Sequence, residues 1–246
     1  MQKDTELNQV KSLAKTFLML DIEPDALSPF VVHHPFTDSS LTISLDSAGQ
    51  PVPVNLLEDE KALQSWRQRM EEEIEKADSA FHIHMMVTKP YRMTFLKYAK
   101  PFLSKKDFSE ILSDAWMRSE YPSYDPDVSQ QEQLAMFHAA DPAALMNEDE
   151  YEHFCSLEDP VTVYRGVTPY NADNIKALSW TLNYDTAAWF AHRFGESGTV
   201  YEAQIAREHI LAYLDGRSEQ EVIVDPEYLM DISETQEMGD GLSLSP

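Results

Sequence analysis

Apolar residues recur at helical spacing through the first part of the chain. From Glu58 to Asp78, apolar side chains follow one helical face with charged residues between them. Residues 107–118 repeat this pattern, and Asp107 is expected to cap that helix. Residues 28–57 are rich in proline and contain short alternating runs such as Leu41–Leu45, which favour irregular structure with a hairpin. This part of the chain is therefore predicted to be mainly helical.

The last third of the chain has the pattern of short strands around one helix. Val161–Val167 is rich in β-branched residues, and Thr199–Ile205 alternates between apolar and polar positions. Between them, residues 183–194 carry apolar residues at helical spacing, with Asn183 as the expected cap and Gly195 placed to end the helix. Further strand candidates are residues 177–181, 209–214 and 219–224.

The order of these elements, strand, strand, helix and three strands, predicts an α+β fold rather than a regular βαβ winding. We expect a helical N-terminal region over residues 1–155 and a strand-rich region over residues 156–246, either as two domains or as one continuous domain. Between two helical stretches, Tyr121–Pro126 contains two prolines and is predicted to be a loop.

The charge of the chain limits its partners. Its 246 residues are 43 % apolar, enough for a sizeable core, and carry a formal net charge of −24. Such a charge disfavours general binding to phosphate backbones and to anionic membranes. The charge is uneven, however, because six cations lie between residues 89 and 106 with no acid among them. They form either a solvated helix face or a docking surface for an anionic partner: Lys89, Arg92, Lys97, Lys100, Lys105 and Lys106.

Several kinds of site are disfavoured by composition. The single cysteine, Cys155, excludes an internal disulfide and a cysteine-based zinc site, and the histidine pairs lack further ligands, so no metal is expected. No run is long enough to span a membrane, and Leu13–Leu20 does not read as a signal peptide, so a cytoplasmic protein is expected. With only 7 glycines, the chain has no glycine-rich phosphate-binding loop, so a dinucleotide would need another device.

Three short segments in the strand-rich region could carry chemistry. Arg165 interrupts an apolar strand and is followed by Gly166; it could pair with a carboxylate or grip a phosphate. Ser179-Trp180-Thr181 would place two hydroxyls on one strand face, which ordinary alternation also explains.

The third segment holds two closely spaced carboxylates. In an extended strand, Glu219 and Glu221 would point the same way. They form either an exposed acidic start of a strand or a pair divided between stabilising a cation and accepting a proton.

Taken in order, Tyr164-Arg165-Gly166, Ser179-Trp180-Thr181 and Glu219-Gln220-Glu221 resemble the arginine–serine–glutamate class of ADP-ribosyltransferases, including toxin-like phage and bacterial mono-ADP-ribosyltransferases. The resemblance covers residues 161–228. It implies a split β-sheet core and a glycosyltransferase (pentosyltransferase) reaction with NAD as substrate. The chain departs from the family pattern at Trp180, where a small residue is usual, and at Thr181 in place of serine.

The resemblance also implies roles for individual residues. Glu221 would hold the ribose and stabilise its developing cation, Ser179 would orient Glu221, and Arg165 would hold the pyrophosphate. The backbone of Gly166 would meet the nicotinamide amide. Glu219 would contact or deprotonate an arginine acceptor.

For the remaining two residues of the second motif, the roles are less direct. Thr181 would support its strand, and Trp180 would either stack on a ring of NAD or fill the core. Phe190 and Arg193 are assigned to helix packing and to the helix C-terminus rather than to the site.

Several functions stay open at this point. A protein arginine is the expected acceptor, and RNA or DNA is an alternative through the cations of residues 89–106. Two further alternatives are NAD hydrolysis and a non-catalytic interaction protein with the same fold. A toxin or phage–host conflict effector would act in the host-cell cytoplasm, and an inhibitory partner protein stays open.

Overall fold

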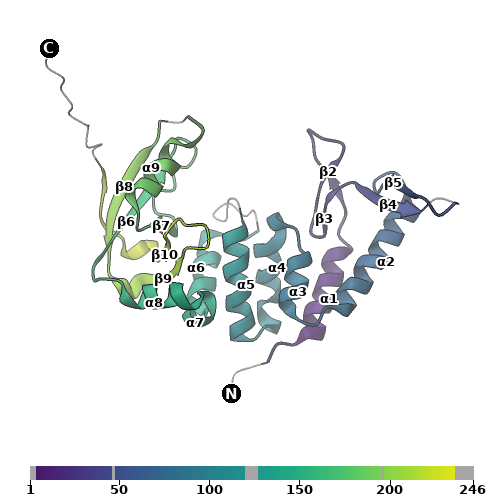
Figure 1. Ribbon diagram of the computed structural model, residues 1–246, viewed down its shortest axis with the longest axis horizontal. Helices are drawn as coiled ribbons and strands as arrows, with labels where there is room; N and C mark the ends of the chain where they lie inside the picture. The colour runs from purple at the N-terminus through teal and green to yellow at the C-terminus, as the bar shows by residue number, and fades with distance from the viewer. Residues whose placement is uncertain (1–3, 46–47, 120–126, 196, 236–246) are drawn as a thin grey trace, which may run out of the picture. The chain divides into compact units, whose positions relative to one another are not determined.

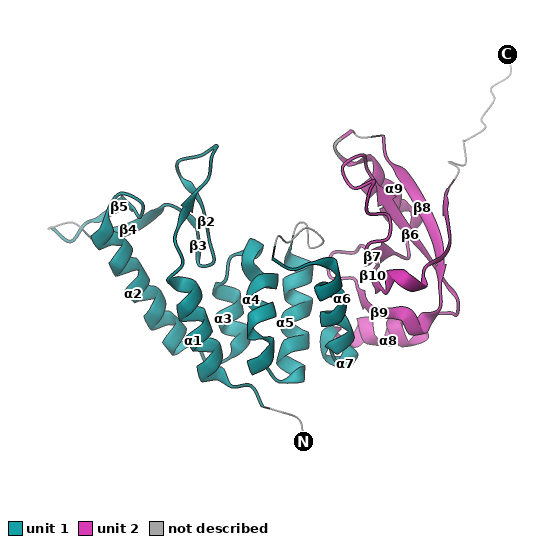
Figure 2. Ribbon diagram, turned by 180° about the vertical axis from the view of Figure 1, so that it is seen from behind, with its two compact units in different colours: residues 1–145 teal, residues 146–246 magenta. Residues whose placement is uncertain are grey.

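The structure is a computed structural model that describes residues 4–45, 48–119, 127–195 and 197–235 (Figure 1). It is an α+β protein and divides into two compact units, residues 1–145 and residues 146–246 (Figure 2). We call them unit 1 and unit 2. The predicted loop Tyr121–Pro126 lies outside the described residues.

Unit 1 is built mainly from helices that pack around a common core. Fully buried side chains such as Leu18, Ile83 and Trp116 come from different helices and fill its interior. The helices are α1 (Leu7–Leu18), α2 (Glu60–Lys76), α3 (Ala80–Met86), α4 (Arg92–Ala99), α5 (Lys105–Arg118), α6 (Gln130–Ala139) and α7 (Pro142–Leu145).

Two small sheets lie between α1 and α2 in the sequence. Strands β1 (Glu23–Pro24), β2 (Val31–His34) and β3 (Thr37–Ser39) form a three-stranded antiparallel sheet. Strands β4 (Leu41–Leu45) and β5 (Pro51–Asn55) pair antiparallel, which confirms the hairpin predicted in this proline-rich region.

Helix α5 begins earlier than the sequence predicted. Its cap is Ser104, whose Oγ accepts a hydrogen bond from the backbone N–H of Asp107 at 3.0 Å. The prediction that Asp107 caps this helix is therefore wrong. Asp107 lies in the first turn instead, where its negative charge favours the positive end of the helix dipole and where Thr5 donates a hydrogen bond to its carboxylate.

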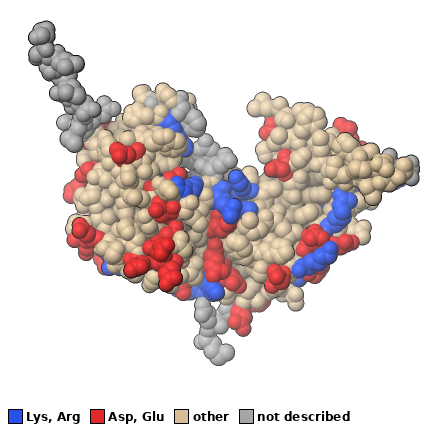
Figure 3. Space-filling view, in the orientation of Figure 1, with Lys and Arg blue, Asp and Glu red and all other residues tan. Residues whose placement is uncertain are grey.

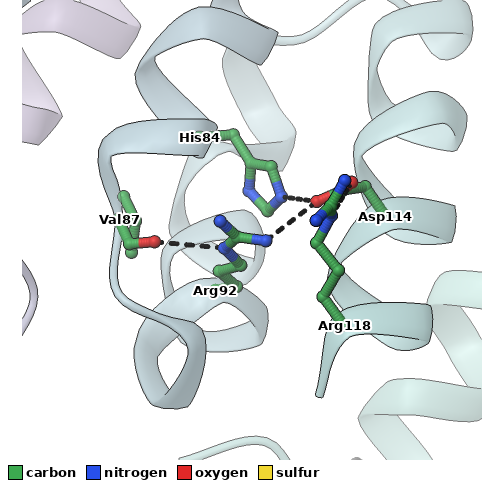
Figure 4. Close-up of polar contacts among 5 residues, drawn as sticks. All are labelled: His84, Val87, Arg92, Asp114 and Arg118. Atoms are coloured by element: carbon green, nitrogen blue, oxygen red, sulfur yellow. Dashed lines mark hydrogen bonds and ion pairs between the residues drawn. The ribbon is translucent and has the colours of Figure 1, made fainter.

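The cations of residues 89–106 differ in burial and pairing within unit 1. The face drawn in Figure 3 carries its Lys and Arg side chains in separate groups. Arg92 is only 6 % exposed, and its Nη1 lies 3.1 Å from Asp114 Oδ2 (Figure 4). Lys97 forms an ion pair with Glu132 at 2.9 Å. The positive charges of Arg92 and Lys97 are thus compensated by carboxylates of unit 1 itself.

Asp114 is the centre of a buried network that ties α3, α4 and α5 together. His84 Nε2 lies 2.9 Å from its Oδ2, and Arg118 Nε lies 2.6 Å from its Oδ1 (Figure 4). Burial alone would raise the pKa of Asp114, but the hydrogen bonds from His84 and Arg118 outweigh it and hold that pKa at about 2. The carboxylate therefore stays charged at neutral pH and compensates the buried Arg92.

Unit 2 contains a six-stranded sheet with the strand order β11-β8-β6-β7-β10-β9, in which the neighbouring strands pair antiparallel. Its strands are β6 (Val161–Val167), β7 (Ser179–Thr181), β8 (Thr199–Ile205), β9 (Ile210–Leu214), β10 (Glu221–Val224) and β11 (Met230–Glu234). Two helices belong to this unit, α8 (Glu148–Ser156) and α9 (Tyr184–His192).

The sheet is narrow at its centre. Strands β6 and β8 pair along their whole lengths, whereas the pairing of β6 with β7 is confined, in the described residues, to Tyr164 and Thr181. The sheet therefore consists of two halves, β11-β8-β6 and β7-β10-β9, joined at one register position. We call this position the junction.

Helix α8 belongs to unit 2, although the sequence placed the division after Cys155. The carboxylate of Glu150 accepts a hydrogen bond from the backbone N–H of Asp215 at 2.7 Å, and Met146 Sδ accepts one from Tyr213 N–H at 3.2 Å. These contacts join α8, and Met146 two residues before its start, to the end of β9, and the observed division falls between Leu145 and Met146.

Candidate active site

The register of β7 and β10 brings a serine against a buried carboxylate. Thr181 lies opposite Glu221, and Ser179 lies opposite Ile223, so Ser179 and Glu221 are diagonal neighbours. The Ser179 hydroxyl donates to Glu221 Oε1 at 2.5 Å, and Glu221 is 5 % exposed. The carboxylate is thus fixed in direction within the sheet.

Arg165 connects the two halves of the sheet at the junction. It lies on β6, next to Tyr164, and its Nη1 donates to the carbonyl oxygen of Ser179 at 2.5 Å. The structure therefore brings together the arginine, the serine and the glutamate that the sequence singled out, with one residue from each of β6, β7 and β10.

Gly166 is required by helix packing. A Cβ atom at this position would lie 2.2 Å from the carbonyl oxygen of Ala187 and 2.6 Å from the backbone nitrogen of Ala191, both in α9. The space of a side chain at this position is filled by α9, which packs Ala187 and Ala191 against the sheet together with Val200. The lack of a side chain is thus explained by helix packing, and the contact of the Gly166 backbone with nicotinamide stays a prediction.

Trp180 and Thr181, the other two residues of the motif that begins at Ser179, contact other parts of unit 2. Trp180 is 2 % exposed and its indole N–H donates to the carbonyl oxygen of Ala177 at 3.0 Å. Of the two roles left open for this ring, filling the core is therefore the one observed, which corrects its alternative placement against NAD. Thr181 donates to the carbonyl oxygen of Glu219 at 2.7 Å and accepts from the backbone N–H of Asn183 at 3.0 Å. Its hydroxyl positions the chain before β10 and the start of α9.

The sequence predicted that Glu219 and Glu221 lie on one extended strand and point the same way. The structure shows that they do not. Strand β10 begins at Glu221, and Gln220 has φ +47°, which breaks the extended conformation between the two glutamates. Glu219 belongs instead to residues 215–220, which connect β9 to β10. We call this segment the acceptor loop, because it carries Glu219, which the resemblance assigns to the acceptor, and includes residues 215–218, which would then face the acceptor.

The two carboxylates nevertheless meet at a residue that the sequence did not assign to the site. Arg217 Nη2 lies 2.8 Å from Glu219 Oε2 and 3.5 Å from Glu221 Oε2. In the sequence, Arg217 is one of only five cations after residue 150 and stands two positions before Glu219. The scarcity of cations in this region could have drawn attention to Arg217. Its contact with both carboxylates, however, depends on the fold of the turn.

Asp215 holds the turn of the acceptor loop. Its Oδ1 accepts from the backbone N–H of Gln220 at 2.9 Å, and its carbonyl oxygen accepts from Ser218 N–H at 2.8 Å. Glu150 in turn holds Asp215 through the hydrogen bond described above. Asp215 and Glu150 are thus two supporting residues that sequence reasoning missed, because a hydrogen bond across a loop and a contact from a distant helix leave no periodic pattern.

Two aromatic phenols near the site stay protonated at neutral pH. Burial, together with the charge of Asp215, raises the pKa of Tyr213 to about 12. Burial and the neighbouring Glu202 also raise the pKa of Tyr164. The two phenols are therefore not suited to accept a proton at neutral pH.

Phe190 and Arg193 lie at the end of α9 and contact each other. The guanidinium of Arg193 lies 5.3 Å from the centre of the Phe190 ring. The Cβ atom of Phe190 also lies close to the backbone of Gly166, so this half-buried side chain belongs to the packing of α9 on β6.

In the described part of the chain, no group of three or more histidine, cysteine, aspartate or glutamate side chains is placed to hold a metal ion. No helix among the described residues has the length and apolarity to cross a membrane. No protein-family model, curated protein or solved structure matches this chain.

Proposed function

We propose that unit 2 is an ADP-ribosyltransferase-like core that transfers ADP-ribose from NAD to a protein arginine and releases nicotinamide. The observation that carries the proposal is the 2.5 Å hydrogen bond from Ser179 to the buried carboxylate of Glu221, formed beside Arg165. The narrow junction between two half-sheets supports the split β-sheet core that the resemblance implies.

Glu221 supplies the charge that this reaction needs. Cleavage of the bond between nicotinamide and ribose builds positive charge on the ribose, and a fixed carboxylate beside that ring stabilises the transition state more than the ground state. Burial strengthens the interaction because little water screens it. The Ser179 hydroxyl keeps the carboxylate in one orientation, so less reorganisation is needed during the reaction.

Arg165 and Gly166 would hold the remainder of NAD. A guanidinium has five N–H donors in a planar fork, which lets one group support the β7 backbone and also meet phosphate oxygens. Because the chain has no glycine-rich phosphate-binding loop, some other group must bind the phosphates of NAD, and Arg165 would be that group. The backbone of Gly166 would meet the nicotinamide amide, as the resemblance implies.

An arginine acceptor is favoured over a nucleic acid. Glu219 and Glu221 already hold a guanidinium, that of Arg217, which supports a site adapted to this group. The basic segment of residues 89–106, which motivated the nucleic-acid alternative, has Arg92 buried and Lys97 paired with Glu132. The negative net charge of the chain also attracts cationic protein targets.

The first test compares nicotinamide release from NAD by the purified protein and by Glu221→Gln, which keeps the shape of the side chain and removes its charge. Glu227→Gln is the matched control, because Glu227 is exposed and lies after β10. We expect Glu221→Gln to lose turnover and Glu227→Gln to keep it. Wild-type turnover in Glu221→Gln would contradict the proposal.

The second test identifies the acceptor. Labelled NAD is incubated with the protein and a cell lysate, followed by digestion with protease or nuclease. We expect protease to remove the macromolecular label. Loss of the label with nuclease would instead favour RNA or DNA, and free ADP-ribose without any label would favour NAD hydrolysis. An absence of NAD turnover would favour a non-catalytic interaction protein.

A further inference from the structure

The side chain of Arg217 lies where an arginine acceptor is expected to bind. Its Nη2 contacts Glu219 Oε2 at 2.8 Å and lies 3.5 Å from Glu221 Oε2. The Glu221 side chain is 6 % exposed, whereas those of Glu219 and Arg217 are 25 % and 38 % exposed. The guanidinium thus approaches the buried carboxylate from the solvent side and is held there by Glu219.

The backbone of the acceptor loop produces this arrangement at a cost. Ser218 and Gln220, on either side of Glu219, have φ +57° and φ +47°, a left-handed conformation that is unfavourable for a non-glycine residue. Asp215 and the hydroxyl of Thr181 hold the turn through hydrogen bonds to Gln220 and Glu219.

We propose that Arg217 is an acceptor within its own chain: in the presence of NAD, and without a competing guanidinium, its side chain receives the ADP-ribosyl group. This inference rests on the proposed function and adds a modification site to it. It also defines the substrate class, because an external acceptor must replace Arg217 between Glu219 and Glu221 and must therefore present a guanidinium group.

The transfer balances without any further reactant. The bond between nicotinamide and C1′ of the ribose breaks, and its electron pair leaves with nicotinamide, which becomes neutral. A guanidino nitrogen of Arg217 forms the new bond to C1′ and loses one proton, which Glu219 accepts and passes to water. The products are nicotinamide, a proton and Arg217 carrying ADP-ribose on its guanidinium.

The test maps self-modification. Wild-type protein is incubated with NAD, digested and analysed by peptide mass spectrometry for the mass of one ADP-ribosyl group. Arg217→Lys keeps the positive charge and removes the guanidinium, and Glu221→Gln removes the catalytic charge. Arg207→Lys is the matched control, because Arg207 lies in the turn before β9, where its guanidinium is 5.9 Å from the ring of Phe154.

We expect modification of Arg217 in the wild type and in Arg207→Lys, and its loss in Arg217→Lys and Glu221→Gln. Dilution should leave the first-order rate unchanged, because the acceptor belongs to the same molecule. Agmatine, a small guanidinium compound, should become ADP-ribosylated and suppress the modification of Arg217.

Three results would overturn the inference. If NAD is consumed or agmatine is labelled while Arg217 stays unmodified, Arg217 is not an acceptor, and the proposed function stands. If dilution slows the modification of Arg217, the transfer runs between molecules and the assignment within one chain is wrong. If the wild type consumes no NAD at all, the proposed function fails and this inference fails with it.

Discussion

Glu221 is held by two groups that act on it differently. The Ser179 hydroxyl donates to Oε1 and sets the direction of the carboxylate, whereas the Arg217 guanidinium lies near Oε2 and carries a charge. Orientation and charge compensation therefore come from separate residues on separate elements, and each can be changed without the other.

Replacement of Ser179 by alanine should lower NAD turnover by about 10- to 100-fold, since a hydrogen bond to a charged group contributes about 1.5–3 kcal/mol. The measurement is nicotinamide release under saturating NAD. Ser156→Ala is the control, because the Ser156 hydroxyl donates to His153 on the exposed surface of α8. Equal turnover in the two variants would show that Ser179 does not orient Glu221 for the reaction.

Replacement of Gly166 by alanine should destabilise unit 2 by about 1–3 kcal/mol or more, because the added Cβ would lie 2.2 Å from the backbone of Ala187. Urea denaturation followed by circular dichroism measures this loss. Gly195→Ala is the comparison: its Cβ meets nothing within 4 Å, and the cost is only that of φ +77°. A stable Gly166→Ala protein would contradict the close packing of α9 on β6.

At this scale the sequence predicted which residues meet better than it predicted why they are there. Strand order and side-chain type were enough to single out Arg165, Ser179 and Glu221. The role of Gly166 depends on how close α9 lies to the sheet, and the contacts of Arg217 depend on a turn with two left-handed residues. Neither distance nor turn geometry follows from periodicity.

At the scale of elements, regular hydrophobic patterns gave accurate boundaries. Strands β6 and β8 have the bounds that the sequence predicted, and Asn183 caps α9 by accepting from the backbone N–H of Thr186 at 3.0 Å. The wrong boundaries are those set by local backbone geometry rather than by the hydrophobic pattern. Ser104 caps the start of α5, and the positive φ of Gln220 delays the start of β10. Strand β11 was missed because its residues are mostly exposed and lack an apolar face.

Strand β2 contains a buried histidine that should make the stability of unit 1 depend on pH. His34 is 1 % exposed, and its Nδ1 accepts from the backbone N–H of Phe36 at 3.1 Å. Burial, together with the charge of Arg67, lowers the pKa of His34 to about 4. The folded protein thus keeps this ring neutral at a pH where the unfolded chain binds a proton.

We therefore expect His34 to lower the free energy of unfolding as the pH falls below about 6.5, by about 2 kcal/mol at pH 5. Urea denaturation of the wild type and of His34→Asn at pH 7 and pH 5 measures this effect. Asparagine can still accept from Phe36 but does not titrate, so the variant should lose less stability between the two pH values. An identical loss in both proteins would exclude His34 as the source.

At the scale of the whole molecule, the division into two units determines which part of the chain carries the proposed activity. All the residues of the candidate site, with their supporting contacts from Glu150 and Asp215, lie in unit 2. Unit 1 has its own core and its own buried ionic network around Asp114. The two units can therefore be tested separately.

A fragment of residues 146–246 should fold and release nicotinamide from NAD, whereas a fragment of residues 157–246 should do so poorly. The shorter fragment lacks Met146 and Glu150, and with Glu150 the hydrogen bond that holds Asp215 at the start of the acceptor loop. Circular dichroism and NAD turnover of the two fragments check this prediction. Equal behaviour would show that α8 is dispensable and that the division belongs near residue 156.

The close contact between Gly166 and α9 affects how similar chains should be recognised. Because the glycine serves the packing of the helix on the sheet, a descendant that lost all enzymatic activity would still need it to fold. Ser179 and Glu221, in contrast, would be released from selection as soon as catalysis ceased. A glycine at this position of β6 is therefore a marker of architecture, and under the proposed function the serine–glutamate contact is what separates a working enzyme from an inactive copy of its scaffold.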